Sequence, residues 1–131
     1  MEEKIYVVQE HWASQHHFDF RLERDGVLKS WAIPKALPLK TGEKRLAIAV
    51  DDHDLAYAGF EGEITEGYGR GMVRIWDKGV YTASKWEEDE ILLELRGGKL
   101  HGKYALVRVK QGKFAAGGDN WLLIKRKEEQ Q

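Results

Sequence analysis

The chain has 131 residues and a mass of 15.1 kDa, the size of one ordinary domain built around a single hydrophobic core. Its 21 basic and 22 acidic residues give a formal net charge of −1, so any attraction to a nucleic acid or a lipid surface must be local. The lack of cysteine excludes disulfide bonds, thiolate metal sites and a cysteine nucleophile.

Apolar residues make up 42% of the chain and charged residues 33%, as in folded soluble proteins. No apolar run approaches the roughly 18 residues that span a bilayer, and the first residues lack the apolar core of a signal peptide. We therefore expect one soluble domain over residues 1–131, with a polar tail over 126–131. We also expect a monomer in the cytoplasm, without membrane contact.

The first half of the chain predicts short β-strands. Residues His17–Leu22 alternate strictly between polar and apolar side chains, which indicates a half-buried strand. Asp25-Gly26 follows and predicts a two-residue hairpin turn, because such turns need positive φ. The prolines at 34 and 38 indicate a surface loop over 35–44. The strands expected here are Ile5–Gln9, His17–Leu22, Val27–Ile33 and Leu46–Val50.

The second half continues the pattern after a polar loop over Asp51–Asp54. Residues Glu61–Gly71 are rich in glycine and indicate an irregular loop or a bulged edge. Turn signals over 77–79, 96–98, 111–112 and 117–119 separate the remaining strands. These are Met72–Trp76, Val80–Trp86, Ile91–Leu95, Tyr104–Val109 and Trp121–Lys125.

No stretch sustains the 3.6-residue period of a helix beyond about ten residues. Eight or nine short strands at close spacing indicate an all-β, mainly antiparallel fold. We expect a small closed or partly open β-barrel of about eight strands, with long loops and little helix. The five tryptophans fall largely at strand positions, where this residue is more often core filler than a stacking surface.

Three of the five histidines, His11, His16 and His17, lie within seven residues. On the strand that begins at His17, the two-residue period places His17, Asp19 and Arg21 in a row on the face opposite the core, about 7 Å apart. His16 has the opposite parity, so His11 is the third candidate ligand. Two histidines and one aspartate with open positions suit Mn²⁺, Fe²⁺ or Zn²⁺. The alternative, that the row is merely the solvated face of an amphipathic strand, has about equal weight.

Arg21 favours a site for an anion, because its guanidinium grips phosphate through two parallel hydrogen bonds. Lys35, directly after a proline, and Arg45, at the entry to an apolar strand, would add positive charge, although either is more often only a surface residue. His53 and Tyr57 lie in the polar region at a strand end, where ligand contacts are common. A solvent-facing histidine is the simpler interpretation of His53.

Seven motifs follow one another at fixed spacing: Val7–His11, His17–Glu23, Gly26–Lys35, Arg45–Ala47, Asp52–Tyr57, Phe60–Gly62 and Trp76–Gly79. In combination they closely resemble the 3′-phosphoesterase module of ligase D, the bacterial multifunctional DNA repair ligase, and its stand-alone bacterial and archaeal relatives. The resemblance covers nearly the whole chain.

The resemblance implies a small antiparallel β-barrel that trims 3′ ends at DNA breaks with Mn²⁺, with Zn²⁺ or Co²⁺ as alternative ions. A phosphodiesterase step would remove a terminal ribonucleoside, and a phosphomonoesterase step would then remove the 3′-phosphate to leave a 3′-OH end. The expected partners are DNA or RNA–DNA primer-template 3′ ends, and separately encoded ligase, polymerase and end-binding proteins are further candidates.

The resemblance also implies roles for individual residues. His11, His17 and Asp19 would bind the metal. Arg21, His53 and Tyr57 would act in catalysis, with His53 either donating to a phosphate oxygen or protonating the leaving oxygen. The nucleophile stays open. The residues around the phosphate would be Arg21, Lys35, Arg45, His53 and Tyr57, with Gln9 and Asp51 as further polar contacts.

Two rival assignments come from other classes. A non-haem iron oxygenase on a double-stranded β-helix also uses a His-x-Asp pair and a distant histidine, here His53 or His101, but it would leave His11 unused. A non-catalytic module of the oligonucleotide-binding (OB) type would stack bases on its aromatic residues. It would bind nucleic acid without a metal and leave it unchanged.

Overall fold

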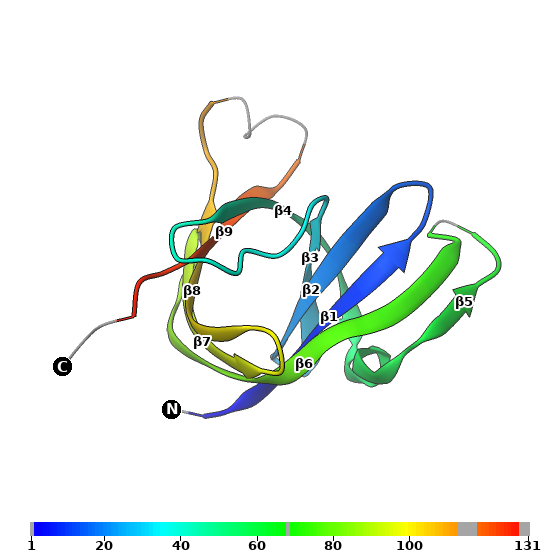
Figure 1. Cartoon of the computed structure of the whole chain (residues 1–131), viewed down its shortest axis with the longest axis horizontal. Helices are drawn as coiled ribbons and strands as arrows, with labels where there is room; N and C mark the ends of the chain where they lie inside the picture. Colours follow the sequence, from blue (N-terminus) through cyan, green and yellow to red (C-terminus); the bar gives the residue numbers. More distant parts are fainter. Residues whose placement is uncertain (1, 68, 113–117, 129–131) are drawn as a thin grey trace.

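Antiparallel strands make up nearly all of the regular structure, which confirms the predicted all-β class (Figure 1). The structure is a computed structural model, and it describes residues 2–67, 69–112 and 118–128. Within these residues one short 3-10 helix, η1 (Leu55–Gly59), interrupts the strands. The strands are β1 (Lys4–Trp12), β2 (His16–Arg24), β3 (Val27–Ile33), β4 (Lys44–Asp54), β5 (Gly62–Ile64), β6 (Gly71–Trp86), β7 (Glu90–Gly97), β8 (His101–Arg108) and β9 (Asn120–Lys125).

Eight of these strands close into a barrel. The sheet runs in the order β1-β2-β3-β4-β9-β8-β7-β6, and a further pairing between β1 and β6 joins its ends. β5 pairs only with the first part of β6 in the described residues and lies outside the closed ring. The ring therefore consists of two meanders joined at β4–β9 and β1–β6, which confirms the expected barrel of about eight strands.

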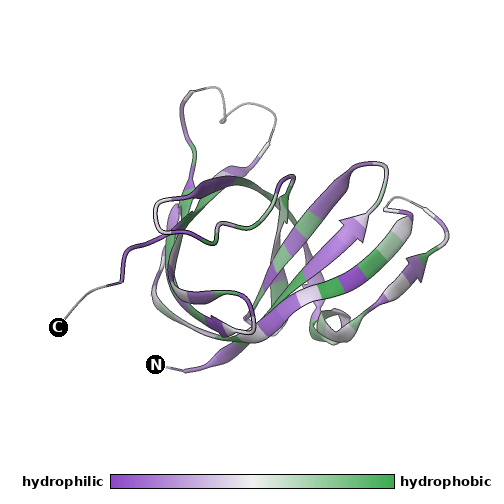
Figure 2. Ribbon diagram, viewed as in Figure 1, coloured by the Kyte–Doolittle hydropathy of each residue, from purple (hydrophilic) through white to green (hydrophobic). Residues whose placement is uncertain are grey.

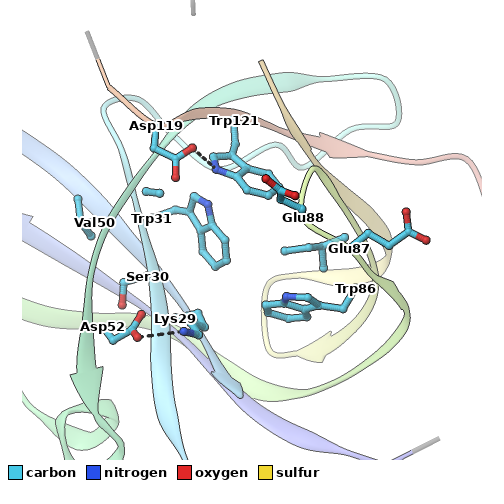
Figure 3. A pocket seen from close by; sticks show the side chains of 12 residues that line it. Lys29, Ser30, Trp31, Val50, Asp52, Trp86, Glu87, Glu88, Asp119 and Trp121 are labelled. Carbon is cyan, nitrogen blue, oxygen red and sulfur yellow. Dashed lines mark hydrogen bonds and ion pairs between the residues drawn. The ribbon is translucent and has the colours of Figure 1, made fainter. Parts of the chain in front are cut away.

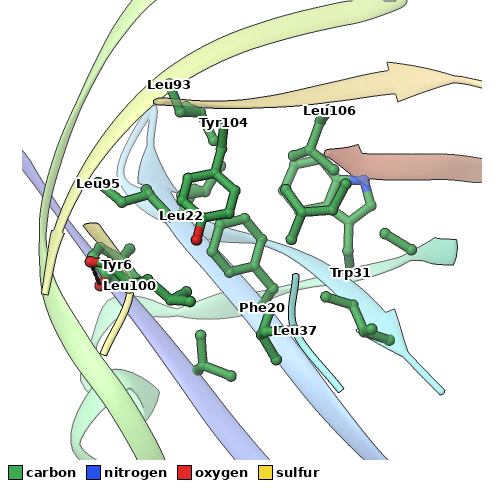
Figure 4. Close-up of a cluster of buried hydrophobic side chains, with 14 of the residues drawn as sticks. Tyr6, Phe20, Leu22, Trp31, Leu37, Leu93, Leu95, Leu100, Tyr104 and Leu106 are labelled. Carbon is green, nitrogen blue, oxygen red and sulfur yellow. Dashed lines mark hydrogen bonds between the residues drawn. The ribbon is translucent and has the colours of Figure 1, made fainter. Parts of the chain in front are cut away.

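The inward-facing side chains fill the barrel. Its core contains aromatic residues from several strands, among them Tyr6, Phe20, Trp31 and Tyr104 (Figure 4). Polar and apolar residues alternate along β2, which matches the period of a strand with one buried face (Figure 2). The segment between β3 and β4 was expected at the surface, but its Leu37 side chain is 2% exposed and belongs to the core.

The predicted β2–β3 hairpin is present with its two-residue turn. Asp25 has φ of 54° and Gly26 has φ of 81°, the left-handed conformation that such a turn requires at both positions. Arg24 pairs with Val27 directly before and after it. This turn fixes the register of β2 and β3, and with it the face to which each polar residue of β2 points.

The predicted turn over 77–79 is wrong, because β6 continues without a break through these residues. A bulge in the β1–β6 ladder takes up one extra residue at Trp76 and bends the strand. The Asp77 carboxylate, instead of starting a turn, accepts hydrogen bonds from the β7–β8 turn. A Cβ at Gly79 would collide with the backbone carbonyl of Arg96, so this glycine allows two strands to approach closely.

Among the described residues, no helix has the length and apolar character needed to cross a membrane.

Candidate active site

The polar row expected on β2 lies on the outer face of the barrel wall, opposite the core. In the β1–β2 ladder His11 lies opposite His17, and Gln9 lies opposite Asp19. Paired residues in an antiparallel sheet project from the same face, so all four share one surface. Phe20, of the other parity, lies in the core.

Three of these side chains converge. One ligand atom each from His11, His17 and Asp19 lies within 4.8 Å of the other two. Oδ2 of Asp19 is 3.3 Å from Nε2 of His17 and 3.7 Å from Nδ1 of His11. Ligand atoms bound to one ion at about 2.1 Å are themselves separated by about 3 to 3.4 Å, depending on geometry. The three groups therefore need to move little to hold one divalent ion.

The second nitrogen of each imidazole faces a backbone carbonyl. Nδ1 of His17 lies 2.9 Å from the carbonyl oxygen of Gln15, and Nε2 of His11 lies 2.7 Å from that of Gly69. Because a carbonyl only accepts, each of these nitrogens carries a proton, and in the neutral ring the nitrogen facing Asp19 offers a lone pair. This is how proteins hold histidine ligands for a metal, so the residues present fit a divalent cation.

The charges within this group keep Asp19 ionised. Burial by itself raises the pKa of Asp19, but the hydrogen bond from His17 and the guanidinium of Arg21 outweigh burial and lower that pKa below its usual value. The same hydrogen bond raises the pKa of His17, against the effect of burial. The carboxylate of Asp19, which lies beside the two histidine rings, is therefore ionised at neutral pH.

Arg21 lies beside this group and is 3% exposed. Its Nε donates to Oε1 of Gln9 at 2.6 Å, and its Nη1 donates to Oγ of Ser30 at 2.9 Å. Its Nη2 lies 3.4 Å from Oδ2 of Asp19. Burial lowers the pKa of Arg21, but a guanidinium stays charged at any physiological pH. The result is a fixed positive fork at the edge of the group formed by His11, His17 and Asp19.

His53 reaches this face through a bulge in β4. The polar loop expected over 51–54 is wrong, because β4 extends to Asp54. Ser30 of β3 pairs with Val50 and Leu28 pairs with His53, so two residues of β4 oppose one residue of β3 between these pairs. Without the extra residue, strict alternation would point His53 to the same side as Ala49, against the core.

The contacts of His53 define its protonation. Nδ1 lies 3.1 Å from Nη1 of Arg21 and 3.2 Å from the carbonyl oxygen of Asp51. A guanidinium only donates, so Nδ1 accepts from Arg21 and the proton of the neutral ring is on Nε2. Burial and the nearby guanidinium both lower the pKa of His53, which favours this neutral form. His53 thus offers one N–H donor from its second nitrogen.

The helix η1 was not predicted, and it covers this face of the barrel. The centroid of the Tyr57 ring lies 4.7 Å from the centroid of the His53 ring and 5.0 Å from Cζ of Arg21. Gln9 holds η1 in place, because Nε2 of its buried amide donates to the carbonyls of Tyr57 and Phe60 at 2.8 and 3.2 Å. Burial raises the pKa of Tyr57, so its hydroxyl keeps its proton at neutral pH.

The other predicted site residues lie farther along the sheet. Lys35 is exposed, two residues beyond the end of β3. Arg45 lies at the start of β4, where Nη2 is 3.6 Å from Oε2 of Glu43. The side chain of Asp51 is exposed, and its backbone carbonyl faces His53. The contacts that the described residues make with Arg21 include neither Lys35 nor Arg45.

Sequence reasoning missed three groups that shape the site. Ser30 accepts from Arg21, and its place was visible in the hairpin register, since it lies opposite Arg21. The carbonyls of Gln15 and Gly69 face the two histidine ligands. Backbone oxygens leave no trace in a residue pattern, and Gly69 approaches His11 from a segment 58 residues away.

A pocket of about 380 Å³ lies on another part of the barrel and includes Ser30 but none of the other residues that contact Arg21 (Figure 3). Three tryptophans, Trp31, Trp86 and Trp121, line it. Its charged lining residues are Lys29, Asp52, Glu87, Glu88 and Asp119. Carboxylates outnumber cations there, and Lys29 already pairs with Asp52 at 3.0 Å. Such a pocket disfavours a phosphate, so the candidate site is the outer face with His11 and Arg21.

The two rival assignments lose their structural basis. The iron-oxygenase grouping joined His17 and Asp19 to His53 or His101, whereas among the described residues the third member is His11. The strand order is that of two meanders, unlike a jelly roll. The OB-type module would be a smaller, five-stranded barrel.

Comparison with known proteins gives one consistent result. A family model described as the DNA ligase D 3′-phosphoesterase domain matches residues 9–108. The multifunctional non-homologous end joining protein LigD of Mycobacterium bovis is 48% identical over an alignment of 129 residues, which covers 95% of this chain and 16% of the relative. The LigD protein of Pseudomonas aeruginosa is 45% identical over an alignment of 130 residues, which covers 94% of this chain and 15% of that relative. The chain thus spans about one sixth of these relatives, and it belongs to the DNA ligase D 3′-phosphoesterase domain family.

Proposed function

We propose that this protein is a metal-dependent 3′-phosphoesterase that prepares DNA 3′ ends for ligation. The observation that carries the proposal is the convergence of His11, His17 and Asp19 beside the buried guanidinium of Arg21. A site that offers three metal ligands and a fixed cation is suited to a phosphate ester. The relatives are named as non-homologous end joining proteins, which supports a DNA end as the substrate.

The ion that the three ligands would hold is proposed to be Mn²⁺, which would polarise a phosphoryl oxygen. Arg21 would bind a non-bridging oxygen of the phosphate and offset the charge that develops there. Its contacts with Gln9, Ser30, His53 and Asp19 hold the guanidinium in one orientation. Little reorganisation is then needed when the phosphate arrives.

His53 and Tyr57 would complete the site on the side of η1. The Nε2–H of neutral His53 would donate to a phosphate oxygen or to the leaving oxygen, and the hydroxyl of Tyr57 is a second neutral donor. Lys35 and Arg45 would contact the nucleic acid beyond the reacting phosphate, and Asp51 would be a further polar contact. The proposed reactions are removal of a 3′-terminal ribonucleoside and of a 3′-phosphate.

The test uses primer-templates ending in a 3′-phosphate or in a single ribonucleotide, with Mn²⁺ added. Wild type should convert both ends to 3′-OH, whereas His17→Ala and Arg21→Ala should lose nearly all activity. His101→Ala is the matched control, because this exposed histidine lies on β8, away from the site. Full activity of His17→Ala would refute the metal assignment, and an inert wild type with Mn²⁺ would refute the function.

A further inference from the structure

Trp12 differs from the other four tryptophans. Trp31 and Trp121 are buried in the barrel, and Trp76 and Trp86 pack against the core. The Trp12 side chain is 42% exposed. Burial of an indole is strongly favourable, so the exposed part of this ring offers apolar surface to a ligand.

The exposed indole is held rigidly. Its ring stacks on the imidazole of His16, with 5.4 Å between centroids and 11° between planes. The carboxylate of Glu10 fixes His16 through a hydrogen bond of 2.7 Å to Nε2. His16 in turn packs against Phe18 at 5.4 Å, and Phe18 packs against Trp76 at 5.7 Å. This ladder of rings connects the exposed indole to the core.

Trp12 and His16 form the next pair in the β1–β2 ladder after His11 and His17. One step along a strand is about 3.3 Å, so the stacked rings lie close to the metal ligands, on the other face of the same two strands. Met72 of β6 lies opposite Trp12 and is 36% exposed. We call Trp12, His16 and Met72 the indole platform.

The edge of β2 connects the two faces. Pairing between β2 and β3 begins at Phe18, opposite Ile33, so His16 and His17 lie beyond the end of that ladder. The chain then leaves toward the exposed Lys35. A nucleic acid strand with its 3′ end at His17 can cross this edge and reach the indole platform. Arg74, exposed on the strand that carries Met72, lies opposite Glu10 on the same face, where its charge offsets that carboxylate.

We propose that the indole platform stacks a nucleobase of the substrate strand close to its 3′ end. The proposal rests on the proposed function, since that function places the 3′ end at His17. Single-stranded nucleic acids bind to flat, exposed aromatic rings of this kind, across the strand edge from a phosphate site, and such a ring accepts any base because every base has a π-face. A saturated or abasic residue would find no partner there.

The first test measures binding of a short fluorescent single-stranded DNA by anisotropy, with a chelator present to prevent turnover. Trp12→Ala should weaken binding about tenfold, whereas Trp12→Phe should retain most of the affinity. Ile5→Ala is the matched control, because Ile5 lies at the other end of β1 and is 39% exposed. Equal affinity of wild type and Trp12→Ala would overturn the proposal.

A second measurement locates the stacked base. Oligonucleotides with one abasic residue at the first, second or third position from the 3′ end are compared in wild type and Trp12→Ala. At one position the abasic residue should weaken binding to wild type and have no further effect on Trp12→Ala. If the two losses add at every position, the indole contacts no base and the proposal fails.

The third measurement separates this proposal from the proposed function. With Mn²⁺ and a small phosphate monoester such as p-nitrophenyl phosphate, kcat/KM of Trp12→Ala should equal that of wild type, while its KM for a 3′-phosphorylated primer-template should rise about tenfold. A wild type inert toward both substrates refutes the phosphoesterase, yet the binding data still decide on the platform. If Trp12→Ala loses kcat/KM by the same factor on both substrates, the platform is refuted. Binding of a protein, and not of DNA, through Trp12 would refute it as well.

Discussion

Nε of Arg21 donates a hydrogen bond of 2.6 Å to Oε1 of Gln9, and both side chains are buried. The amide nitrogen of the same Gln9 donates to the carbonyls of Tyr57 and Phe60. The two carbonyls can only accept hydrogen bonds, so the NH₂ group of the Gln9 amide must face them. The amide oxygen of Gln9 therefore faces the guanidinium. One glutamine therefore couples the orientation of Arg21 to the position of η1.

Replacing Gln9 should impair turnover without removing the metal. Gln9→Met keeps the length of the side chain but offers neither the acceptor nor the donors, so Arg21 loses its fixed orientation. We expect kcat on a 3′-phosphorylated primer-template to fall about 10- to 100-fold. Calorimetry should show an unchanged Mn²⁺ affinity. Gln111→Met, at an exposed position, is the control. A parallel loss of Mn²⁺ affinity would contradict the positioning role.

Metal binding should depend on all three ligands and on pH. His17→Ala and Asp19→Asn should each weaken Mn²⁺ binding by about 100-fold or more, whereas His101→Ala should not. Protons compete with the ion for the His17 lone pair, and the pKa of His17 is raised by its hydrogen bond to Asp19. Affinity measured by calorimetry should therefore begin to fall at a pH above the ordinary histidine value of about 6.5. An affinity that is flat through that range would count against His17 as a ligand.

The stability of the metal-free protein should report the lowered pKa of His53. Burial and Arg21 favour neutral His53 in the folded state, so its contribution is complete above the unfolded pKa of about 6.5 and is lost as pH falls through the lower folded pKa. The stability advantage of wild type over His53→Gln should thus shrink between about pH 7.5 and pH 5. Thermal unfolding of both proteins in the presence of a chelator, at several pH values, measures this difference in stability.

The exposed His101 provides the control for that experiment. The difference in melting temperature between wild type and His101→Gln, measured over the same pH range, shows what replacing an exposed histidine does by itself. If the advantage of wild type over His53→Gln grows toward acid pH, the folded state favours protonated His53 and its assignment as a neutral donor is wrong.

Asp77 should matter for stability and not for chemistry. Its carboxylate accepts from the hydroxyl of Tyr6 at 2.8 Å and from the backbone N–H groups of Gly98, Lys99 and Leu100 at 3.0, 2.9 and 2.9 Å. Asp77→Asn replaces one carboxylate oxygen by an NH₂ group, which cannot accept from the donors that surround it. This should lower the free energy of unfolding by about 1–3 kcal/mol. Urea denaturation measures this loss.

A matched variant separates this effect from a general change of charge. Asp54→Asn removes one carboxylate at the exposed end of β4 and should shift the free energy of unfolding by less than about 0.5 kcal/mol. Tyr6→Phe removes one of the four donors and should cost about 1 kcal/mol. If Asp77→Asn is as stable as Asp54→Asn, the carboxylate does not hold the β7–β8 turn.

The sequence alone determined what depends on local geometry. Alternation over His17–Leu22 placed His17, Asp19 and Arg21 on one face, because successive side chains of a strand point in opposite directions. Asp25-Gly26 determined the hairpin, because few dipeptides adopt positive φ twice. Spacing of short strands determined the β-barrel class.

The tertiary structure decided everything that depends on pairing between distant segments. The ladder between β1 and β2 placed His11 beside His17, and the bulge in β4 turned His53 away from the core and toward Arg21. The signals at Asp51–Asp54 and 77–79 are those of turns, yet both segments are strands, since pairing with neighbouring strands satisfies their backbone groups. Trp12 lies beyond the predicted strand Ile5–Gln9, and only the tertiary structure shows that β1 continues to Trp12 and leaves its side chain exposed. Register, bulges and exposure follow from contacts across the whole chain, and a local pattern does not contain them.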